Sequence, residues 1–181
     1  MKKALPVTEY SYRIYPDEKQ VAIIRQTIEA YHHVYDHYLK IRIAAYNGER
    51  RFVSTYDFMK DLKNLKAEEP ELQTIDSQAL TYALMELDHD FSVFIKSSKH
   101  YPKIRGQKNK DYRYYRTRNV NNNIRFRSYS IVLPKIGSVR LLDWNEGIFG
   151  NEVQPPPGRI VFARVEEKDS REFYVKVYVN Q

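Results

Sequence analysis

Residues 91–133 read FSVFIKSSKHYPKIRGQKNKDYRYYRTRNVNNNIRFRSYSIVL, and the hydrophobic period changes within this stretch. Before Tyr101-Pro102, apolar residues recur at intervals of three and four, which is the spacing of an amphipathic helix. After it, apolar and polar residues alternate, which is the spacing of a half-buried strand. A chain that changes from the first pattern to the second predicts an α+β fold.

Two helices are predicted near the start of the chain. Asp17 and Gln20 have the spacing of a capping box, which opens a helix that runs towards Tyr46. Ser54 and Asp57 have the same spacing and open a second, shorter helix.

A third helix precedes the change of period, with Asp76 as its N-cap. Its apolar residues follow a four-three-four-three spacing that buries one long stripe. They are Leu80, Leu84, Leu87, Phe91 and Phe94. Three amphipathic helices of this kind predict a small helical bundle.

Five segments alternate as antiparallel strands do, and residues 145–158 are predicted to be a long loop among them. The segments are residues 1–14, 130–133, 138–142, 159–165 and 173–179. Because a strand at the N-terminus needs a partner later in the chain, we expect residues 1–14 to join the sheet. The prediction is a β-barrel-like domain of residues 1–14 and 112–181, interrupted by a helical insert at residues 15–111.

A basic segment runs from Lys96 to Arg140, with thirteen Lys and Arg residues and a single acid, Asp111. The whole chain has 30 basic and 23 acidic residues, so the basic segment has a net charge of +12 and the remainder −5. So many positive charges in one segment repel one another unless a polyanion neutralises them. Nucleic acid is therefore the first partner to consider, although a basic segment can also be a solvated surface.

The remaining composition limits the class of protein. With 42% hydrophobic residues in 181, the chain can bury a core, so it is not a disordered basic tail. It has no cysteine, and therefore no disulfide or thiolate zinc site. The apolar stretch after Lys3 ends by Glu9, too soon for a signal peptide, and no later run approaches membrane-spanning length. We expect a cytoplasmic, nucleoid-associated protein.

Residues 115–124 read YRTRNVNNNI and resemble the Y-R-T-x-x-x-N-N-N-I signature of TnpB, also called OrfB transposase. TnpB is the RNA-guided DNA nuclease of bacterial and archaeal transposons. Further matching motifs follow the family's order along almost the whole chain. They are YRIYP at 12–16, VYD at 34–36, DSQAL at 76–80, PKI at 102–104 and LPKIG at 133–137.

The resemblance implies a wedge domain, which is an oligonucleotide-binding-like antiparallel β-barrel, with an inserted helical recognition domain of helix-turn-helix-like type. In the family, a RuvC-like nuclease domain with magnesium-binding carboxylates follows. This sequence stops at Gln181, about where that domain begins, and lacks the family's four zinc-ribbon cysteines. We therefore expect the recognition half alone, which is not an enzyme by itself and needs no cofactor.

The resemblance also implies which side chains contact the short DNA motif beside the target. Gln78 has the amide that can form a bidentate contact with adenine, and hydroxyl groups can reach other base edges or phosphate. The matching positions are Tyr56, Ser77, Gln78, Thr81 and Thr117.

Contacts to RNA and to phosphates are expected along the basic segment. The candidates are Lys103, Arg105, Lys108, Lys110, Arg113, Arg116, Arg118, Asn121, Asn122, Asn123 and Arg125. The asparagines suit either phosphate contacts or a turn with left-handed backbone. Tyr112, Tyr114 and Tyr115 suit either base stacking or the core of a half-buried strand.

Two other pairs have the spacing of chemical sites. His33 and His37 have the spacing of metal ligands on a helix, but no third ligand converges with them, so we assign no metal. Glu86 and Asp90 lie one turn apart like a carboxylate pair, which exposed helix faces also produce.

The expected function is the recognition part of an RNA-guided nuclease, and the partners are guide RNA, duplex DNA beside the target, and a separate or downstream RuvC-like domain. The alternative is a self-sufficient helix-turn-helix-type DNA-binding regulator that needs no RNA. A third class, an enzyme in its own right, predicts magnesium-dependent cleavage by the chain, and we expect none.

Overall fold

The computed structural model describes most of the chain and divides it into two compact units. The described residues are 7–49, 51–97, 100–106, 110–141, 153–168 and 171–180. The sheet unit comprises residues 1–25 and 113–181, and the helical unit comprises residues 26–112. The assignment of a barrel domain and a helical insert at residues 15–111 stays a prediction.

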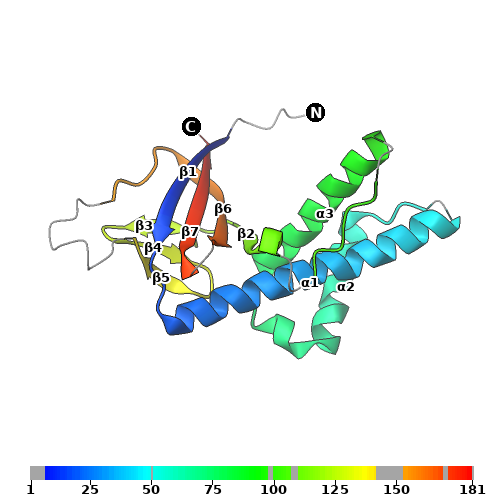
Figure 1. Ribbon diagram of the computed structural model, residues 1–181, viewed down its shortest axis with the longest axis horizontal. Helices are drawn as coiled ribbons and strands as arrows, with labels where there is room; N and C mark the ends of the chain where they lie inside the picture. The colour runs from blue at the N-terminus through cyan, green and yellow to red at the C-terminus, as the bar shows by residue number, and fades with distance from the viewer. Residues whose placement is uncertain are drawn as a thin grey trace. The chain divides into compact units, whose positions relative to one another are not determined.

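In the described part of the chain, three α-helices follow one another between β1 and the remaining strands (Figure 1). They are α1 (Glu18–Glu49), α2 (Thr55–Glu68) and α3 (Ser77–Ser97), and the 3-10 helices η1 (Pro70–Gln73) and η2 (Lys110–Tyr112) accompany them. α1 begins in the sheet unit and continues into the helical unit. None of the helices in the described part of the chain is long and apolar enough to cross a membrane.

The predicted capping box of α1 forms with both of its hydrogen bonds, and that of α2 forms with one of them. The backbone N of Gln20 donates to Oδ1 of Asp17 at 2.9 Å, and the backbone N of Asp17 donates to Oε1 of Gln20 at 3.1 Å. At the start of α2, Oγ of Ser54 accepts from the backbone N of Asp57 at 3.2 Å. These contacts pair N–H groups that the first turn of a helix leaves without partners.

The core of the helical unit is formed by one stripe on each helix. The α3 stripe is buried as predicted at Leu80, Leu84, Leu87 and Phe91, whereas Phe94 is half-buried. α2 buries Phe58, Leu62 and Leu65. α1 contributes tyrosines as well as aliphatic residues, namely Tyr31, Val34, Tyr35, Tyr38 and Leu39.

A four-stranded antiparallel sheet has the order β1-β7-β6-β2. Its strands are β1 (Val7–Ile14), β2 (Tyr114–Arg118), β6 (Arg159–Glu167) and β7 (Phe173–Asn180). The N-terminal strand therefore pairs with the last strand, Val7 opposite Asn180 and Ile14 opposite Phe173, as predicted for an N-terminal strand with a late partner.

A second antiparallel sheet consists of β3 (Arg125–Arg127), β4 (Ser130–Leu133) and β5 (Gly137–Arg140). An isolated bridge joins Tyr15 to Arg140, and the backbone N of Tyr15 donates to the backbone O of Arg140 at 2.8 Å. Across the described strands the two sheets are open and form no closed barrel. Residues 145–152 of the predicted loop lie outside the described residues, and residues 153–158 contain no helix or strand.

Candidate nucleic-acid interface

A groove of about 460 Å³ lies in the sheet unit. Six of its lining residues are Asn119, Asn121, Asn122, Arg125, Phe126 and Arg159, and we call it the Asn–Arg groove. Amide groups, guanidinium groups and an aromatic ring, which all line this groove, are the side chains that contact phosphates, sugars and bases. The groove therefore has the chemistry of a nucleic-acid contact.

A tight turn positions the asparagines of the groove. Asn121 and Asn122 have left-handed backbone, with φ of 53° and 59°, which asparagine adopts more readily than most residues. Oδ1 of Asn123 accepts from the backbone N of Val120 at 2.9 Å, and Oδ1 of Asn119 accepts from the backbone N of Ile124 at 3.0 Å. The outer two amides hold the turn, while those of Asn121 and Asn122 are exposed.

The two interpretations of the asparagines, a left-handed turn and a nucleic-acid contact, are both compatible with Asn121 and Asn122. Asn123, predicted as a phosphate contact, uses its side-chain oxygen to build the turn. Asn121 and Asn122 have the left-handed backbone and also present their amides to the groove. Arg125 lies beside them and donates from NH1 to the backbone oxygen of Asn122 at 3.1 Å.

The four-stranded sheet has a polar face on which cations and aromatic rings form cross-strand rows. Register places Arg116 opposite Arg164, and Arg164 opposite Lys176. The next row aligns Arg118, Phe162, Tyr178 and Glu9 across the four strands. The rings of Phe162 and Tyr178 stack, with centroids 4.1 Å apart and an interplanar angle of 12°.

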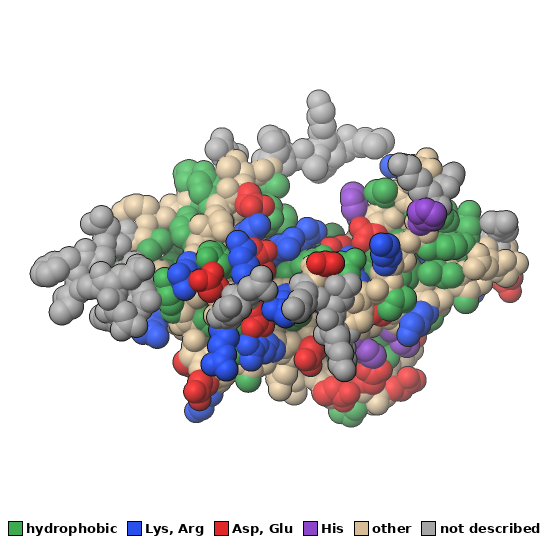
Figure 2. Space-filling view, in the orientation of Figure 1, with side chains coloured by type: hydrophobic (Ala, Val, Ile, Leu, Met, Phe, Trp, Pro, Cys, Tyr) green, Lys and Arg blue, Asp and Glu red, His purple; other side chains and the backbone are tan. Residues whose placement is uncertain are grey.

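Acids partly neutralise the cations of this polar face. Nζ of Lys176 is 3.6 Å from Oε1 of Glu9 and 3.7 Å from Oε1 of Glu166. Nε of Arg164 is 3.0 Å from Oε2 of Glu166. Figure 2 likewise shows blue and red side chains interleaved over the sheet unit rather than a uniform basic surface.

Tyr178 and Glu9 are coupled by a hydrogen bond. The hydroxyl of Tyr178 donates to Oε2 of Glu9 at 2.5 Å. Burial, reinforced by this hydrogen bond, raises the pKa of Tyr178 to about 12. The same hydrogen bond lowers the pKa of Glu9. The phenol is therefore neutral and the carboxyl ionised at neutral pH.

The structure places Arg105 inside the helical unit. Its NH2 atom is 3.2 Å from Oε1 of Glu86 and 3.0 Å from Oδ2 of Asp90, and its guanidinium lies 3.5 Å from the ring centroid of Tyr35. The side chain is only 4% exposed. Because acids already neutralise it, Arg105 no longer belongs among the phosphate contacts we propose.

The contacts of Arg105 also explain the Glu86–Asp90 pair. Glu86 is buried, so the pair does not belong to an exposed helix face as its spacing suggested. The two carboxylates are the counter-ions of Arg105, and the backbone N–H groups of Arg105 and Gly106 donate to Asp36. These contacts hold residues 105–106 against α1 and α3.

The three tyrosines predicted to stack on bases lie in the protein interior or against other side chains. Tyr115 is 1% exposed and Tyr114 is 7% exposed. The guanidinium of Arg164 lies 3.8 Å from the ring centroid of Tyr114. Tyr112 is half-buried in the helical unit, where its ring is 5.6 Å from that of His32. The core interpretation therefore accounts for Tyr115, while Tyr114 lies on the same face of β2 as Arg116 and packs against Arg164.

Four of the five predicted DNA-motif residues belong to the helical unit, and the fifth belongs to the sheet unit. Ser77, Gln78 and Thr81 share the first turns of α3, where Nζ of Lys66 donates to Oγ of Ser77 at 3.0 Å. Tyr56 is 65% exposed but lies ten residues before Lys66, about 15 Å along α2. Thr117 belongs to the sheet unit and is fully buried on the apolar face of β2, so its side chain cannot reach a base edge without unfolding.

The other predicted contacts differ in exposure. Lys103 and Arg118 are exposed, whereas Arg113 and Arg116 are half-buried. Lys108 and the side chain of Lys110 lie outside the described residues.

His33 contacts an acid in the helical unit. Its Nε2 is 2.7 Å from Oε2 of Glu69, and its ring centroid is 6.5 Å from that of His37. Within the described ranges, no three His, Cys, Asp or Glu side chains form a group that could hold a metal ion.

Several residues of the interface were not predicted from the sequence. Arg159 lines the Asn–Arg groove, and Phe162, Arg164, Lys176 and Tyr178 lie on the polar face. Their alternation with Ile160, Ala163 and Val177 identified the strands. The polar residues of these strands could have been predicted to share one exposed face, since alternate residues of a strand point to the same side.

Residues 7–51 match the family model HTH_OrfB_IS605, which describes a helix-turn-helix domain. In this structure the matched range contains one strand, β1, and one long helix, α1. A search of curated proteins finds no match to the chain.

Proposed function

We propose that the chain, whose residues 7–51 match the HTH_OrfB_IS605 model, is the nucleic-acid-recognition part of an RNA-guided DNA nuclease of the OrfB/TnpB type. It binds guide RNA and the duplex beside the target, and it does not cleave DNA by itself. A RuvC-like nuclease domain, separate or downstream, would supply the cleavage.

The observation that carries this proposal is the Asn–Arg groove. Asn121 and Asn122 present two amides from a rigid turn, and Arg125 and Arg159 add two cations beside them. Amides contact phosphates and sugar hydroxyls without adding charge, and guanidinium groups pair with phosphate. This combination suits a strand that the protein reads by its backbone, as in a guide RNA.

We propose a second contact at the start of α3, where duplex DNA would meet Ser77, Gln78 and Thr81. Gln78 is half-buried, and its backbone N donates to Oδ1 of Asp76 at 3.0 Å, so its position is fixed by the helix cap. The adjacent Lys66 brings a positive charge to the same end of the helix. A side-chain amide on this capped first turn, with a cation nearby, suits a base-edge contact next to a phosphate contact.

The fold proposed for the sheet unit is an oligonucleotide-binding-like wedge barrel. The bridge between Tyr15 and Arg140 supports it, because it ties the end of β1 to the end of β5. Nε2 of Gln20 also donates to the backbone oxygen of Ser138 at 2.8 Å, across the same junction.

The proposal is tested by titrating the purified chain against structured transposon-end RNA and duplex DNA over a range of salt concentrations. Six phosphate contacts give a slope of log affinity against log salt near −4 to −5. A nearly flat titration would remove the electrostatic premise. Incubation of each nucleic acid with magnesium should leave it uncut, and cleavage would make the chain an enzyme.

The alternative function is a DNA-binding regulator that needs no RNA. The polar start of α3 favours it, since Ser77, Gln78 and Thr81 begin a helix that follows a short connection, as in a recognition helix. Strong duplex binding together with indifference to RNA would support the regulator against the recognition subunit.

A further inference from the structure

A second pocket of the sheet unit has a volume of about 580 Å³ and contains an unusual number of cations. Four arginines line it, namely Arg13, Arg25, Arg140 and Arg171. We call it the arginine pocket. None of the four was predicted as a nucleic-acid contact, because they are widely separated in the sequence.

The fold brings these arginines together by pairing the ends of three strands. The bridge of Tyr15 to Arg140 places the end of β5 against the end of β1. The pairing of Ile14 with Phe173 places the start of β7 at the same point, and Arg171 comes just before it. Arg171 has left-handed backbone, with φ of 70°. Such a conformation is strained for a non-glycine residue and is enriched at functional sites.

Two of the four arginines already have carboxylate partners. Arg25 forms a bidentate pair with Glu167, with Nε and NH2 at 3.1 and 2.6 Å from the two carboxylate oxygens. NH2 of Arg13 is 3.3 Å from Oε1 of Glu172, and its guanidinium lies 5.2 Å from the ring centroid of Tyr15.

The other two, Arg140 and Arg171, are exposed, and no acid among the described residues lies within ion-pair distance of either. Glu18 also lines the pocket, but no ion pair joins it to these arginines. Within the described residues, Arg140 and Arg171 are thus the two guanidinium groups of the pocket without a carboxylate partner, and Arg13 and Arg25 are the two that have one. Guanidinium groups bind phosphate oxygens bidentately, which makes phosphate the anion that this arrangement fits.

We infer that the arginine pocket binds a backbone phosphodiester of the nucleic acid, with Arg140 and Arg171 as its ligands. This inference rests on the proposed function, because it supplies a second anchoring point in the sheet unit for the same nucleic acid. The contact is independent of base identity, so it positions the strand without selecting its sequence.

The test replaces Arg140 with Gln and Arg171 with Asn, since Asn tolerates the left-handed backbone at position 171. The control pair is Lys19→Ala with Lys40→Ala, which removes the same charge from exposed positions of α1. Binding of single-stranded RNA is measured by fluorescence anisotropy at several salt concentrations. The arginine variant should bind about tenfold more weakly, with a salt slope shallower by about 1 to 1.5. The lysine variant should keep the wild-type slope.

A second variant, Glu18→Gln, removes an acid from the pocket and should raise RNA affinity about twofold by reducing repulsion of the phosphate. The inference would be overturned if the wild type and the arginine variant had equal salt slopes, or if the arginine and lysine variants lost equal RNA affinity. Either result would leave the proposed function intact. Failure of the wild-type chain to bind any nucleic acid would overturn both.

Discussion

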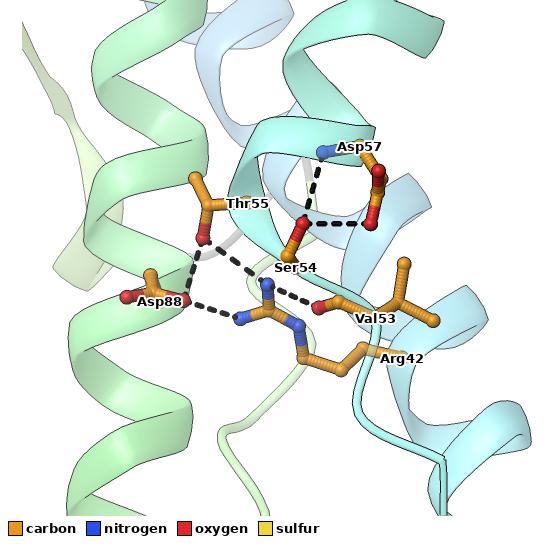
Figure 3. Close-up of polar contacts among 6 residues, drawn as sticks. All are labelled: Arg42, Val53, Ser54, Thr55, Asp57 and Asp88. Atoms are coloured by element: carbon orange, nitrogen blue, oxygen red, sulfur yellow. Dashed lines mark hydrogen bonds and ion pairs between the residues drawn. The ribbon is translucent and has the colours of Figure 1, made fainter.

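Arg42 and Asp88 form an ion pair in the helical unit, with NH1 of Arg42 3.3 Å from Oδ1 of Asp88 (Figure 3). The Arg42 side chain is fully buried, whereas that of Asp88 is 42% exposed. NH2 of Arg42 also donates to the backbone oxygen of Val53 at 3.0 Å and to Oγ1 of Thr55 at 3.3 Å. One cation therefore ties α1 to the start of α2 and the middle of α3.

Aromatic rings surround this buried cation. Its guanidinium lies 4.9 to 5.4 Å from three ring centroids, those of Phe52, Phe58 and Phe91. Burial lowers the pKa of Arg42, and the Asp88 carboxylate opposes that shift. The contacts with rings and with Asp88 offset the cost of removing the charge from water.

Replacing Arg42 with Ala should lower the free energy of unfolding by about 3 kcal/mol, since it removes the hydrogen bonds and leaves a cavity between three helices. Replacing it with Met should cost less, because Met fills the volume without a charge. Urea unfolding measures both. Arg51→Ala is the matched control, since Arg51 is 68% exposed in its ion pair with Glu49 and should contribute less than about 0.5 kcal/mol. Equal loss in both alanine variants would contradict a central role for Arg42.

The helices could be predicted from the sequence because their signals are local. Asp17 with Gln20 forms a full capping box within one turn, and Ser54 forms the N-cap hydrogen bond expected of it with Asp57. The apolar stripe of α3 follows directly from a 3.6-residue period. Arg42 gave no such signal, because its partner Asp88 is 46 residues away and on another helix.

The positions that the cations of the basic segment take in the folded chain could not be predicted either, because they too depend on partners far away in the sequence. The segment's net charge of +12 is a property of the sequence, but Arg105 is neutralised by two acids of α3 that precede it in the chain. Strand β2 then turns adjacent residues to opposite faces, which buries Thr117 in the core beside Ala163 and Val177 and leaves Arg116 on the polar face. The pairing register of β2 with β6 decides which face of β2 is buried. Register depends on residues far apart in the chain, so local sequence patterns do not reveal it.

Replacing both Asn121 and Asn122 with Gly should weaken RNA binding about three- to tenfold, since two amides of the Asn–Arg groove would be lost. Glycine adopts left-handed backbone freely, so the turn should persist. The stability of the protein should change little, and thermal unfolding checks this. Asn123→Gly is the contrasting variant, because it removes the hydrogen bond to the backbone of Val120 and should lower the melting temperature. Unchanged RNA affinity in the double variant would remove the amides from the interface.

The hydrogen bond between Tyr178 and Glu9 predicts a pH dependence of stability at high pH. The pKa of Tyr178 is raised from 10.0 to about 12, so its contribution is complete below pH 10 and is lost as pH rises towards 12. Tyr178→Phe keeps the ring that stacks on Phe162 but has no group to ionise. Its free energy of unfolding should therefore fall less steeply between pH 10 and 12 than that of the wild type, as measured by urea unfolding at each pH.

At low pH the same pair acts in the opposite sense. The pKa of Glu9 is lowered from 4.5, chiefly by the hydrogen bond from Tyr178, so its contribution is present above pH 4.5 and is lost as pH falls below that value. Tyr178→Phe should weaken this dependence as well. Parallel pH profiles of the variant and the wild type at both extremes would show that the hydrogen bond does not contribute to folding.

Gln78→Ala should reduce affinity for duplex DNA by about 1–3 kcal/mol at one base position and leave other positions nearly unchanged, because a bidentate amide contact reads a single base.

Replacing Arg113, Arg116 and Arg118 together should instead weaken binding to all sequences alike. Binding to a set of duplexes that differ at single positions separates the two patterns.

Ser77→Ala provides the control for Gln78→Ala, since Ser77 lies at the same end of α3 and accepts a hydrogen bond from Lys66. Its loss should change affinity without changing which base is preferred, because a hydroxyl can bond to many acceptors and donors. The backbone N–H of Gln78 remains bonded to Asp76 in the alanine variant, so the helix cap is preserved. A uniform loss of affinity from Gln78→Ala would therefore mean that its amide contacts the phosphate backbone, and sequence choice would have to come from elsewhere in the chain.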